Sequence, residues 1–514
     1  MSDLRRKILV AALLIMAVIL PLWPAFEEAG LSMDEGALLV YPQLIAQGAV
    51  PYRDFETFYG PANAWVLSGA YAFGGLNIFT ERALGLLYRI LILGAIFAVV
   101  QRRSITLAAG CVFVCAWLLI PLGLQAYACI GAMACALWSL WCALEVESPR
   151  RCFGGGLLAG LALLYRPDFG PAMIAAGLPL FLLMPKARRW QYLAGALTAL
   201  LPFGWVTILA GPREVINNLV LFPVFQSSAG RHLPIFSVPP FLLSLFFAHL
   251  AAVAVNLVTS LMEIHRRRTD RFARLLLGLG LLALGLTHQA AQRLDAGHLV
   301  APALVSFGLL PLSIFLLQAR RSDQAMRHFH AFLASAAVVI PLQIIAPSMG
   351  IVTLNRLVDS VDGGVHYAVF VDHQGRSFPV SSPLVALGLD AMLEQLDRMA
   401  TPGQRLFVGP ADLRRTNYND TFIYYLMPQL QPATYFLEMN PLSANRPHSR
   451  LAADVATADW LILDHRWDVW NEPNESVKYG SDAPMQVVRN QFQICGQFGN
   501  YGLFRRRPIA LSRN

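Results

Sequence analysis

The chain has 514 residues, of which 56% are hydrophobic and only 14% are charged, and its mean hydropathy is +0.50. Soluble domains are about half apolar and about a quarter charged, so the composition excludes an ordinary soluble protein over the first two thirds and indicates a multi-pass membrane protein. The formal net charge of +8 comes from short basic groups between apolar runs. That is the positive-inside pattern of membrane topology, so the lipid bilayer is an expected partner and nucleic acid is not.

The first apolar stretch follows basic residues at positions 5–7 and runs from residue 8 to residue 26. It is long for a signal peptide, and no small-x-small cleavage site follows it cleanly. We therefore expect an uncleaved first span with its basic end inside. The loop at 27–61 then emerges on the outer side of the membrane.

An apolar stretch at 62–73 decides the topology of every later segment. If it crossed the membrane, five basic clusters would all lie outside, against the positive-inside bias. These clusters are at 101–103, 150–151, 186–189, 265–268 and 320–321. The stretch is also shorter than the roughly 20 residues that a span needs, so we expect a juxtamembrane helix at 62–74 on the outer surface.

Ten further apolar runs bring the expected number of transmembrane helices to about eleven. They are at 84–100, 105–122, 127–144, 153–165, 171–184, 192–209, 241–262, 273–287, 299–317 and 329–345. The fourth and fifth of these runs are short, and a charged turn at 166–170 joins them. Non-helical backbone at membrane depth is tolerated only where protein or a wet cavity surrounds it, so we expect a hairpin that dips below the outer surface.

The composition changes after residue 347, where charged residues become more frequent and long apolar runs stop. We predict strands at 365–371, 405–408 and 460–463, and helices at 383–399 and 421–430. Strands that alternate with helices indicate an α/β domain. The predicted organisation is a membrane all-α module at 1–348 and an extracytoplasmic α/β domain at 349–514.

Charged residues gather on the predicted outer face, whereas the inner face carries mainly basic clusters. The outer groups are Asp34 with Glu35; Arg53, Asp54 and Glu56 followed by Tyr59; Arg166 with Asp168; Arg231 with His232; and Arg293, Asp295 and His298. Ionisable groups against a bilayer are costly to desolvate and mark functional sites. The asymmetry predicts one site built from several outer loops.

Such a site has the groups that sugar transfer from a polyprenyl phosphate needs. A carboxylate can take the proton of an acceptor hydroxyl, and apolar surroundings raise its pKa. Asp34, with Glu35 beside it, is our candidate. A lipid phosphate needs cations as charge develops, and guanidinium groups bind its oxygens in pairs.

The remaining charged residues of the outer face fall into two predicted roles. The residues expected to bind the donor phosphate are Arg166, Arg293 and His298. The residues expected to bind substrate more generally are Arg53, Asp54, Glu56, Tyr59, Asp168, Arg231, His232 and Asp295.

The first outer loop carries three short motifs: Met-Asp-Glu-Gly at 33–36, Tyr-Arg-Asp-Phe at 52–55 and Tyr-Gly-Pro at 59–61. They resemble the first outer loop of GT-C fold glycosyltransferases, closest to the branch with the aminoarabinose transferases and protein O-mannosyltransferases. The resemblance implies a polyprenyl-phosphate monosaccharide donor, inversion at the anomeric carbon, and Asp34 as the matching acidic residue. It implies a multi-pass protein of the bacterial cytoplasmic membrane. The acceptor, whether an envelope glycan, a lipid or a protein, stays open.

Plainer interpretations stand beside these. Acidic residues favour the first turn of a helix, and the arginine–aspartate groups at 166–168 and 293–295 could be structural ion pairs. Residues 471–474 are typical of a turn. The alternative functions are a transporter or flippase for a lipid-linked sugar, and a non-catalytic assembly protein.

The cysteine and histidine pattern gives no support for a metal or a disulfide framework. Seven cysteines are present, and no pair has the spacing of metal ligands or of a redox motif. We therefore expect that no cofactor is required, although the sequence leaves a divalent metal requirement open.

Overall fold

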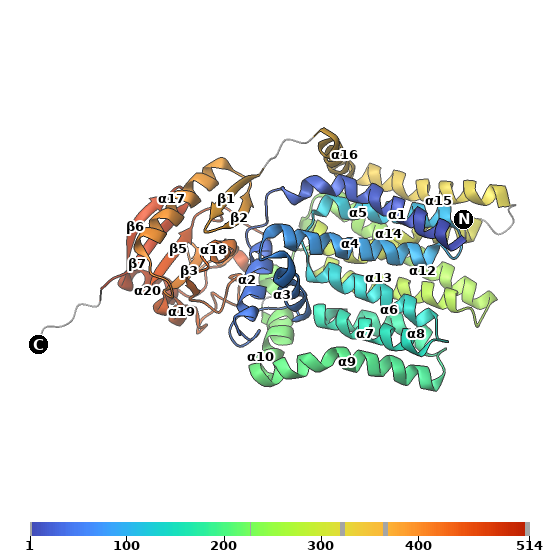
Figure 1. Cartoon of the computed structure of the whole chain (residues 1–514), viewed down its shortest axis with the longest axis horizontal. Coiled ribbons are helices and arrows are strands. Elements are labelled where there is room, and N and C mark those ends of the chain that lie inside the picture. Colours follow the sequence, from blue (N-terminus) through green and yellow to red (C-terminus); the bar gives the residue numbers. More distant parts are fainter. Residues whose placement is uncertain (1–2, 227, 319–323, 363–367, 509–514) are drawn as a thin grey trace, which may run out of the picture.

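A computed structural model describes residues 3–226, 228–318, 324–362 and 368–508. A bundle of long helices forms one part of the molecule, and strands with shorter helices form the other (Figure 1). Short helices that belong to the N-terminal, helical part of the chain lie where the bundle meets the part with strands (Figure 1). The predicted combination of a helical membrane part and a C-terminal part with strands is therefore observed.

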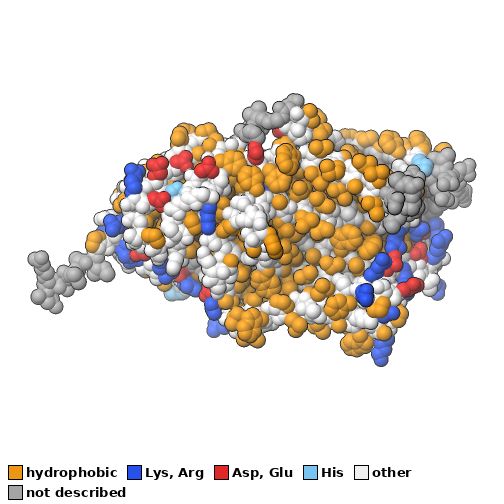
Figure 2. Space-filling view, in the orientation of Figure 1, with side chains coloured by type: hydrophobic (Ala, Val, Ile, Leu, Met, Phe, Trp, Pro, Cys, Tyr) orange, Lys and Arg blue, Asp and Glu red, His pale blue; other side chains and the backbone are white. Residues whose placement is uncertain are grey.

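Eight helices in the described part of the chain are long and apolar enough to cross a membrane. They are α1 (Asp3–Ile19) continued by η1 (Leu20–Phe26), α4 (Ile78–Val100), α5 (Ile105–Leu119) continued by η2 (Ile120–Leu122), α9 (Lys186–Ala210), α12 (Pro240–Arg266), α13 (Arg271–Gln292), α14 (Ala296–Gln318) and α15 (Gln324–Ile345). Hydrophobic side chains cover the middle of the molecule (Figure 2). The protein is a multi-pass membrane protein.

Three shorter helices complete the bundle: α6 (Ala128–Leu144), α7 (Pro149–Tyr165) and α8 (Gly170–Phe181). A single turn, η3 (Pro167–Phe169), joins α7 to α8, where the sequence predicts a hairpin. Because these three helices are shorter than a span usually needs, the number of about eleven transmembrane helices stays a prediction.

The basic clusters of the sequence meet at the end of the bundle away from the C-terminal part (Figure 2). Arg103 lies 3.5 Å from Asp270, and Arg102 and Arg151 both pair with Glu145. Arg188 donates to the carbonyl of residue 146. The cluster at 320–321 lies outside the described residues. The shared end agrees with the positive-inside interpretation of these clusters.

Short helices lie between the bundle and the C-terminal part: α2 (Asp34–Ala46), α3 (Ala62–Gly74), α10 (Pro212–Ile216), the π-helix η4 (Asn217–Gln226) and α11 (Ser228–Arg231). The predicted juxtamembrane helix is α3, with 13 residues. Two glycines allow close packing here. A Cβ on Gly36 would lie 2.4 Å from the backbone nitrogen of Phe422, and one on Gly60 would lie 1.9 Å from the carbonyl oxygen of Leu164. The glycine backbone at residues 36 and 60 therefore lies directly against both parts of the molecule, Phe422 of the C-terminal part and Leu164 of the bundle.

The C-terminal part contains a five-stranded sheet of order β4-β3-β5-β7-β6 and a separate hairpin, β1-β2. Strand β3 is parallel to β4 and β5, and β7 is antiparallel to β5 and β6. The strands are β1 (Val369–His373), β2 (Arg376–Val380), β3 (Arg405–Pro410), β4 (Gln431–Pro432), β5 (Trp460–Asp464), β6 (Phe492–Phe498) and β7 (Tyr501–Arg506). The helices of this part are α17 (Pro383–Met399), α18 (Phe422–Leu426), α19 (Leu451–Thr457) and α20 (Ala483–Gln491), and α16 (Pro347–Asp362) precedes them in the chain.

Several of these elements differ from the sequence prediction. Helix α17 and the strands β3 and β5 lie where we expect them, but the helix expected at 421–430 is only the five-residue α18. Part of the first predicted strand, 365–367, lies outside the described residues. The hairpin partner β2, the edge strands β4 and β6, and the strand β7 between β5 and β6 are not anticipated. Helix α16 packs against η1 of the bundle, so the division at residue 348 stays a prediction.

Candidate active site

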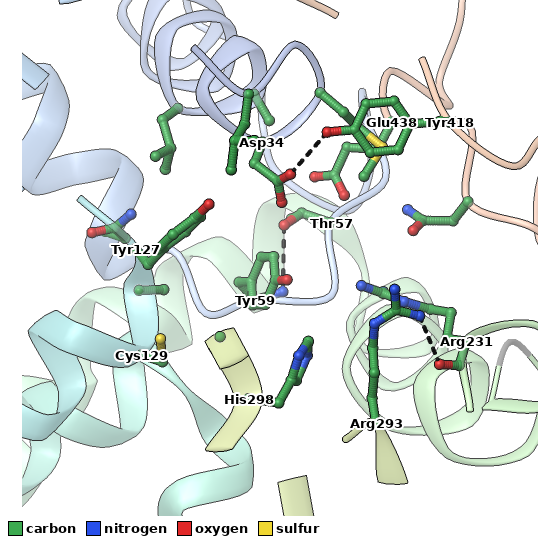
Figure 3. Close-up of a pocket in the computed structure, with 18 of the residues that line it drawn as sticks. Asp34, Thr57, Tyr59, Tyr127, Cys129, Arg231, Arg293, His298, Tyr418 and Glu438 are labelled. Atoms are coloured by element: carbon green, nitrogen blue, oxygen red, sulfur yellow. Dashed lines mark hydrogen bonds between the residues drawn. The ribbon is translucent and has the colours of Figure 1, made fainter. Parts of the chain in front are cut away.

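A cavity of about 380 Å³ lies where the end of the bundle meets the C-terminal part. Its lining comes from the short helices α2 and α3, the first loop, the ends of α7 and α13, and loops of the C-terminal part. The charged and imidazole side chains that line it are Asp34, Arg166, Arg231, Arg293, Asp295, His298, Glu438 and Glu472. All of these except Glu438 and Glu472 are predicted site residues, and so is Tyr59, which also lines the cavity. The predicted residues come from four distant stretches of the sequence. Figure 3 shows most of them pointing into the cavity.

Asp34 is the first residue of α2, and its carboxylate is partly buried at the cavity wall. The hydroxyl of Tyr418 donates to its Oδ2 at 3.3 Å (Figure 3). Burial raises the pKa of Asp34, although the hydrogen bond from Tyr418 and the charge of Arg231 act in the opposite direction. Asp34 is therefore a carboxylate with increased basicity that faces open space.

Glu35, the next residue, points away from the cavity. It is fully buried and forms a two-fold ion pair with Arg82 of α4, with nitrogen–oxygen distances of 2.9 and 3.0 Å. The Nη1 of Arg82 also donates to three backbone carbonyls where η1 passes into the first loop, at residues 25, 26 and 28. The structure thus places Glu35 in an anchor between the first loop and the bundle, without contact to the cavity that its predicted catalytic role requires.

Arg166 follows the end of α7, and Asp168 fixes its orientation. Both oxygens of Asp168 accept from Arg166, at 2.8 and 2.7 Å, and the guanidinium lies 5.1 Å from the ring centre of Tyr59. Gln289 donates to Asp168 at 2.7 Å. Burial opposes ionisation of both partners, but their mutual attraction is stronger: the pKa of Arg166 is raised and that of Asp168 is lowered. Asp168 does not line the cavity and contacts Arg166 instead.

Arg293 follows the end of α13 and is held by two carboxylates. It donates to Asp295 at 2.9 Å and to both oxygens of Glu472, at 2.8 and 2.5 Å. Asp295 also accepts from the backbone nitrogen of His298 and lies 2.9 Å from its Nδ1. Burial disfavours the charge on Asp295, but His298 and Arg293 bring its pKa to about 2. With Nδ1 engaged, the Nε2 of His298 is left for the cavity.

Arg231 is the last residue of α11 and differs from the other two arginines. Among the described residues its guanidinium has no hydrogen bond or ion pair, and its one recorded contact is with the ring of Phe58, 5.5 Å from the centroid. Its charge nevertheless acts on Asp34 and Glu438. The neighbouring His232 is exposed and does not line the cavity.

The middle of the first loop supports the site from outside the cavity. Arg53 and Asp54 pair with each other at the surface. Glu56 is buried against the C-terminal part, where it accepts from Ser443 and, at 3.2 Å, from Asn440. Burial raises the pKa of Glu56 to about 7. Of the substrate-binding residues predicted in this loop, only Tyr59 lines the cavity.

The cavity also contains residues that the sequence analysis does not single out. Glu438 accepts from Tyr41 at 2.7 Å, and burial raises its pKa. Tyr418, Trp470 and Glu472 reach the cavity from loops of the C-terminal part. The stretch at 471–474 has the composition of a turn, so no local pattern marks Glu472. Only the contact between the two parts of the chain brings these residues to Asp34.

No group of three or more histidine, cysteine, aspartate or glutamate side chains within the described residues could hold a metal ion. The cavity carboxylates are instead paired with arginine, tyrosine or histidine. The expectation that no cofactor is required stays a prediction.

No protein-family model matches the sequence, and no curated protein matches it. Among solved structures, ArnT from Cupriavidus metallidurans bound to undecaprenyl phosphate is 13% identical over 98% of each chain, with a TM-score of 0.56. ArnT from the same organism in the apo state is 14% identical over the same shares, with a TM-score of 0.55. The arabinofuranosyltransferase AftD from Mycobacteria is 15% identical over 98% of this chain and 40% of its own, with a TM-score of 0.43. The likeness to ArnT shows that this chain has the GT-C fold.

Proposed function

We propose that the protein is a membrane glycosyltransferase that moves one monosaccharide from a polyprenyl-phosphate donor to an extracytoplasmic acceptor. The observation that carries the proposal is that Asp34 shares one cavity with three arginines and His298. The fold supports it, since ArnT was crystallised with undecaprenyl phosphate. A fold alone does not establish chemistry, so the reaction is argued from the site.

Asp34 is the general base of the proposed reaction. As the acceptor oxygen attacks the anomeric carbon, its proton passes to Asp34, the new carbon–oxygen bond forms, and the bond to the phosphate oxygen breaks. Attack on the face opposite the phosphate inverts the anomeric carbon. The bonding electron pair leaves with the phosphate, and the arginines stabilise the charge that develops there. The raised pKa makes Asp34 a better base than an exposed aspartate.

Arg231 is the arginine best placed to take the phosphate first. Arg166 and Arg293 already share their guanidinium groups with carboxylates, whereas a phosphate at Arg231 has no protein partner to displace among the described residues. A charge-assisted hydrogen bond from Arg231 to the phosphate adds its full strength to binding, because no ion pair in the described part of the chain has to be broken first. Arg166, Arg293 and His298 complete the phosphate site around it.

We expect Arg231→Gln to weaken binding of undecaprenyl phosphate more than Arg166→Gln does. Hydrogen bonds to charged groups contribute about 1.5–3 kcal/mol, so the Kd should rise about 10- to 100-fold for Arg231→Gln. Equilibrium binding to protein in lipid nanodiscs measures the change. Arg53→Gln is the matched control, because the Arg53 side chain is 48% exposed and pairs with Asp54 outside the cavity. Equal effects of the Arg231 and Arg53 variants would remove Arg231 from the phosphate site.

Incubation with a panel of radiolabelled polyprenyl-phosphate sugars tests the proposed activity itself. An enzyme of this kind should release polyprenyl phosphate from at least one donor, by transfer to an acceptor or slowly to water. The alternative, a transporter or flippase, would bind a donor and leave it intact. Intact donor throughout the panel, with protein that binds undecaprenyl phosphate, would decide for the alternative.

The proposed location is the bacterial cytoplasmic membrane, with the N-terminus inside and the C-terminal part extracytoplasmic. The basic clusters at the far end of the bundle support this orientation, since such clusters favour the cytoplasmic side. The cavity then opens on the extracytoplasmic side, where it could meet an envelope glycan, lipid or protein as acceptor.

A further inference from the structure

Three aromatic side chains of the C-terminal part form a cluster at the cavity. The ring centre of Tyr418 lies 4.2 Å from that of Trp467 and 5.9 Å from that of Trp470, and the two tryptophans are 6.0 Å apart. Tyr418 and Trp470 line the cavity, and Trp470 is 42% exposed. A large aromatic ring that is exposed in an open cavity is costly to hydrate, which points to a ligand that covers it.

The cluster is held rigidly from behind. The indole N–H of Trp467 donates to the buried Asp420 at 3.1 Å. The side-chain amide of Asn417 donates to the backbone carbonyls of Trp467 and Trp470, at 3.1 and 2.7 Å. These bonds fix the backbone at both tryptophans, so the points from which the two rings extend are set. Pre-organised groups lose little entropy when a ligand binds.

Arg293 and His298, which we propose bind the donor phosphate, lie across the cavity from Tyr418 (Figure 3). The apolar lining comes from α2 and α3, including Leu38, Pro42 and Leu67, and this side suits a prenyl chain. Arg166 and Arg293 follow the ends of bundle helices, Arg231 ends α11, and His298 lies in the first turn of α14. In Figure 3, Tyr418 and Glu438 lie near Asp34, and His298 and Arg293 reach toward it from the opposite side. The aromatic cluster therefore lies on the side of Asp34 opposite Arg293 and His298, which leaves this side for the acceptor.

The charges near the cluster argue against a phosphate acceptor. Glu438 and Asp34 both line this side of the cavity (Figure 3), and two carboxylates disfavour an added anion. They are, however, good acceptors for hydroxyl groups, and Asn440 adds an amide in the same wall. Aromatic rings flanked by carboxylates and amides match a molecule with one apolar C–H face and hydroxyl groups around its edge.

We propose that the acceptor is a saccharide, one ring of which stacks on Trp470 and Tyr418 while its hydroxyl groups bind Glu438 and Asn440. The inference rests on the proposed function and adds the chemical class of the acceptor. The C–H bonds of a sugar face are weakly positive and meet the negative face of the indole ring. A ring held in this way brings a hydroxyl group to Asp34, whose neighbour Tyr418 belongs to the same cluster.

Saturation-transfer NMR with protein in nanodiscs containing undecaprenyl phosphate tests the acceptor class. The probes are a panel of disaccharides, a serine- and threonine-containing peptide, and glycerol phosphate. We expect ring protons of at least one disaccharide to receive saturation. Trp470→Ala should weaken binding of that disaccharide by about tenfold, because one well-formed stacking contact is lost. Trp470→Phe, which keeps a ring, should stay within about threefold of the wild type.

Val469→Ala is the matched control, because Val469 is the neighbouring residue and is 86% exposed. It should leave binding of the disaccharide unchanged. Binding of the peptide or glycerol phosphate but of no disaccharide would overturn the proposal, and so would equal disaccharide affinity in Trp470→Ala and the wild type. So would the absence of any probe signal in protein that binds undecaprenyl phosphate. A wild-type protein that does not bind undecaprenyl phosphate would instead count against the proposed function.

Discussion

Asp34→Asn should lower the turnover number by about a thousandfold, within the range that general bases contribute. Asparagine has the same shape and still accepts the hydrogen bond from Tyr418, but it cannot take a proton from the acceptor hydroxyl. The measurement is the rate of polyprenyl phosphate release under saturating donor. Affinity for undecaprenyl phosphate should remain near that of the wild type, which separates loss of the base from loss of the site.

The pH profile gives this prediction a second readout. Because the base acts only when deprotonated, the turnover number should fall as the pH drops through the pKa of Asp34. Burial raises that pKa, so the acid limb should lie above the range of an exposed aspartate, which is near 3.9. The Asn variant should lack this limb. An unchanged rate, or the same acid limb in the variant, would show that another group accepts the proton.

Arg82→Met should destabilise the protein by about 3–5 kcal/mol, the cost of leaving one buried charge without its partner. The side chain of Arg82 is only 1% exposed, and that of Glu35 is 0% exposed. Methionine would also leave the three backbone carbonyls that Arg82 binds without a donor. The fall in the thermal unfolding midpoint of the purified protein measures the effect.

Two further variants distinguish loss of the pair from loss of an arginine. Arg53→Met removes one partner of an exposed pair and should cost at most about 1 kcal/mol. Glu35→Leu combined with Arg82→Met should recover much of the stability, because replacing both members of a buried pair with apolar residues is often nearly neutral. A stable Arg82→Met variant would mean that the anchor between the first loop and the bundle lies elsewhere.

The contrast between Asp34 and Glu35 shows what one sequence can and cannot predict. The acidic pair after the first span is visible in the sequence, and so is its expected place at a membrane surface. Which carboxylate faces the cavity is not visible, because neighbouring residues of a helix point about 100° apart. The partner that removes Glu35 from the cavity is Arg82, a buried arginine inside an apolar helix.

The helical part was more predictable than the far wall of the site. Hydropathy and basic clusters indicate long helices and a common inner end, and the turn at 166–170 is visible as a charged break between short apolar runs. Tyr418 lies 384 residues from Asp34, and Glu438 and Trp470 also follow in the C-terminal part. No periodicity connects residues at such distances. The edge strands were missed for a similar reason, since pairing rather than local pattern defines them.

The ion pair between Arg293 and Glu472 also has a consequence for the order of events in a catalytic cycle. Glu472 occupies the fork of Arg293 and lies two residues after Trp470. A lipid phosphate that took over this guanidinium would free the Glu472 carboxylate, while the bond from Asn417 keeps the backbone of Trp470 in place. Binding of the lipid donor would thereby change the part of the cavity where the acceptor binds. Such a linkage would favour binding of the lipid donor before the acceptor.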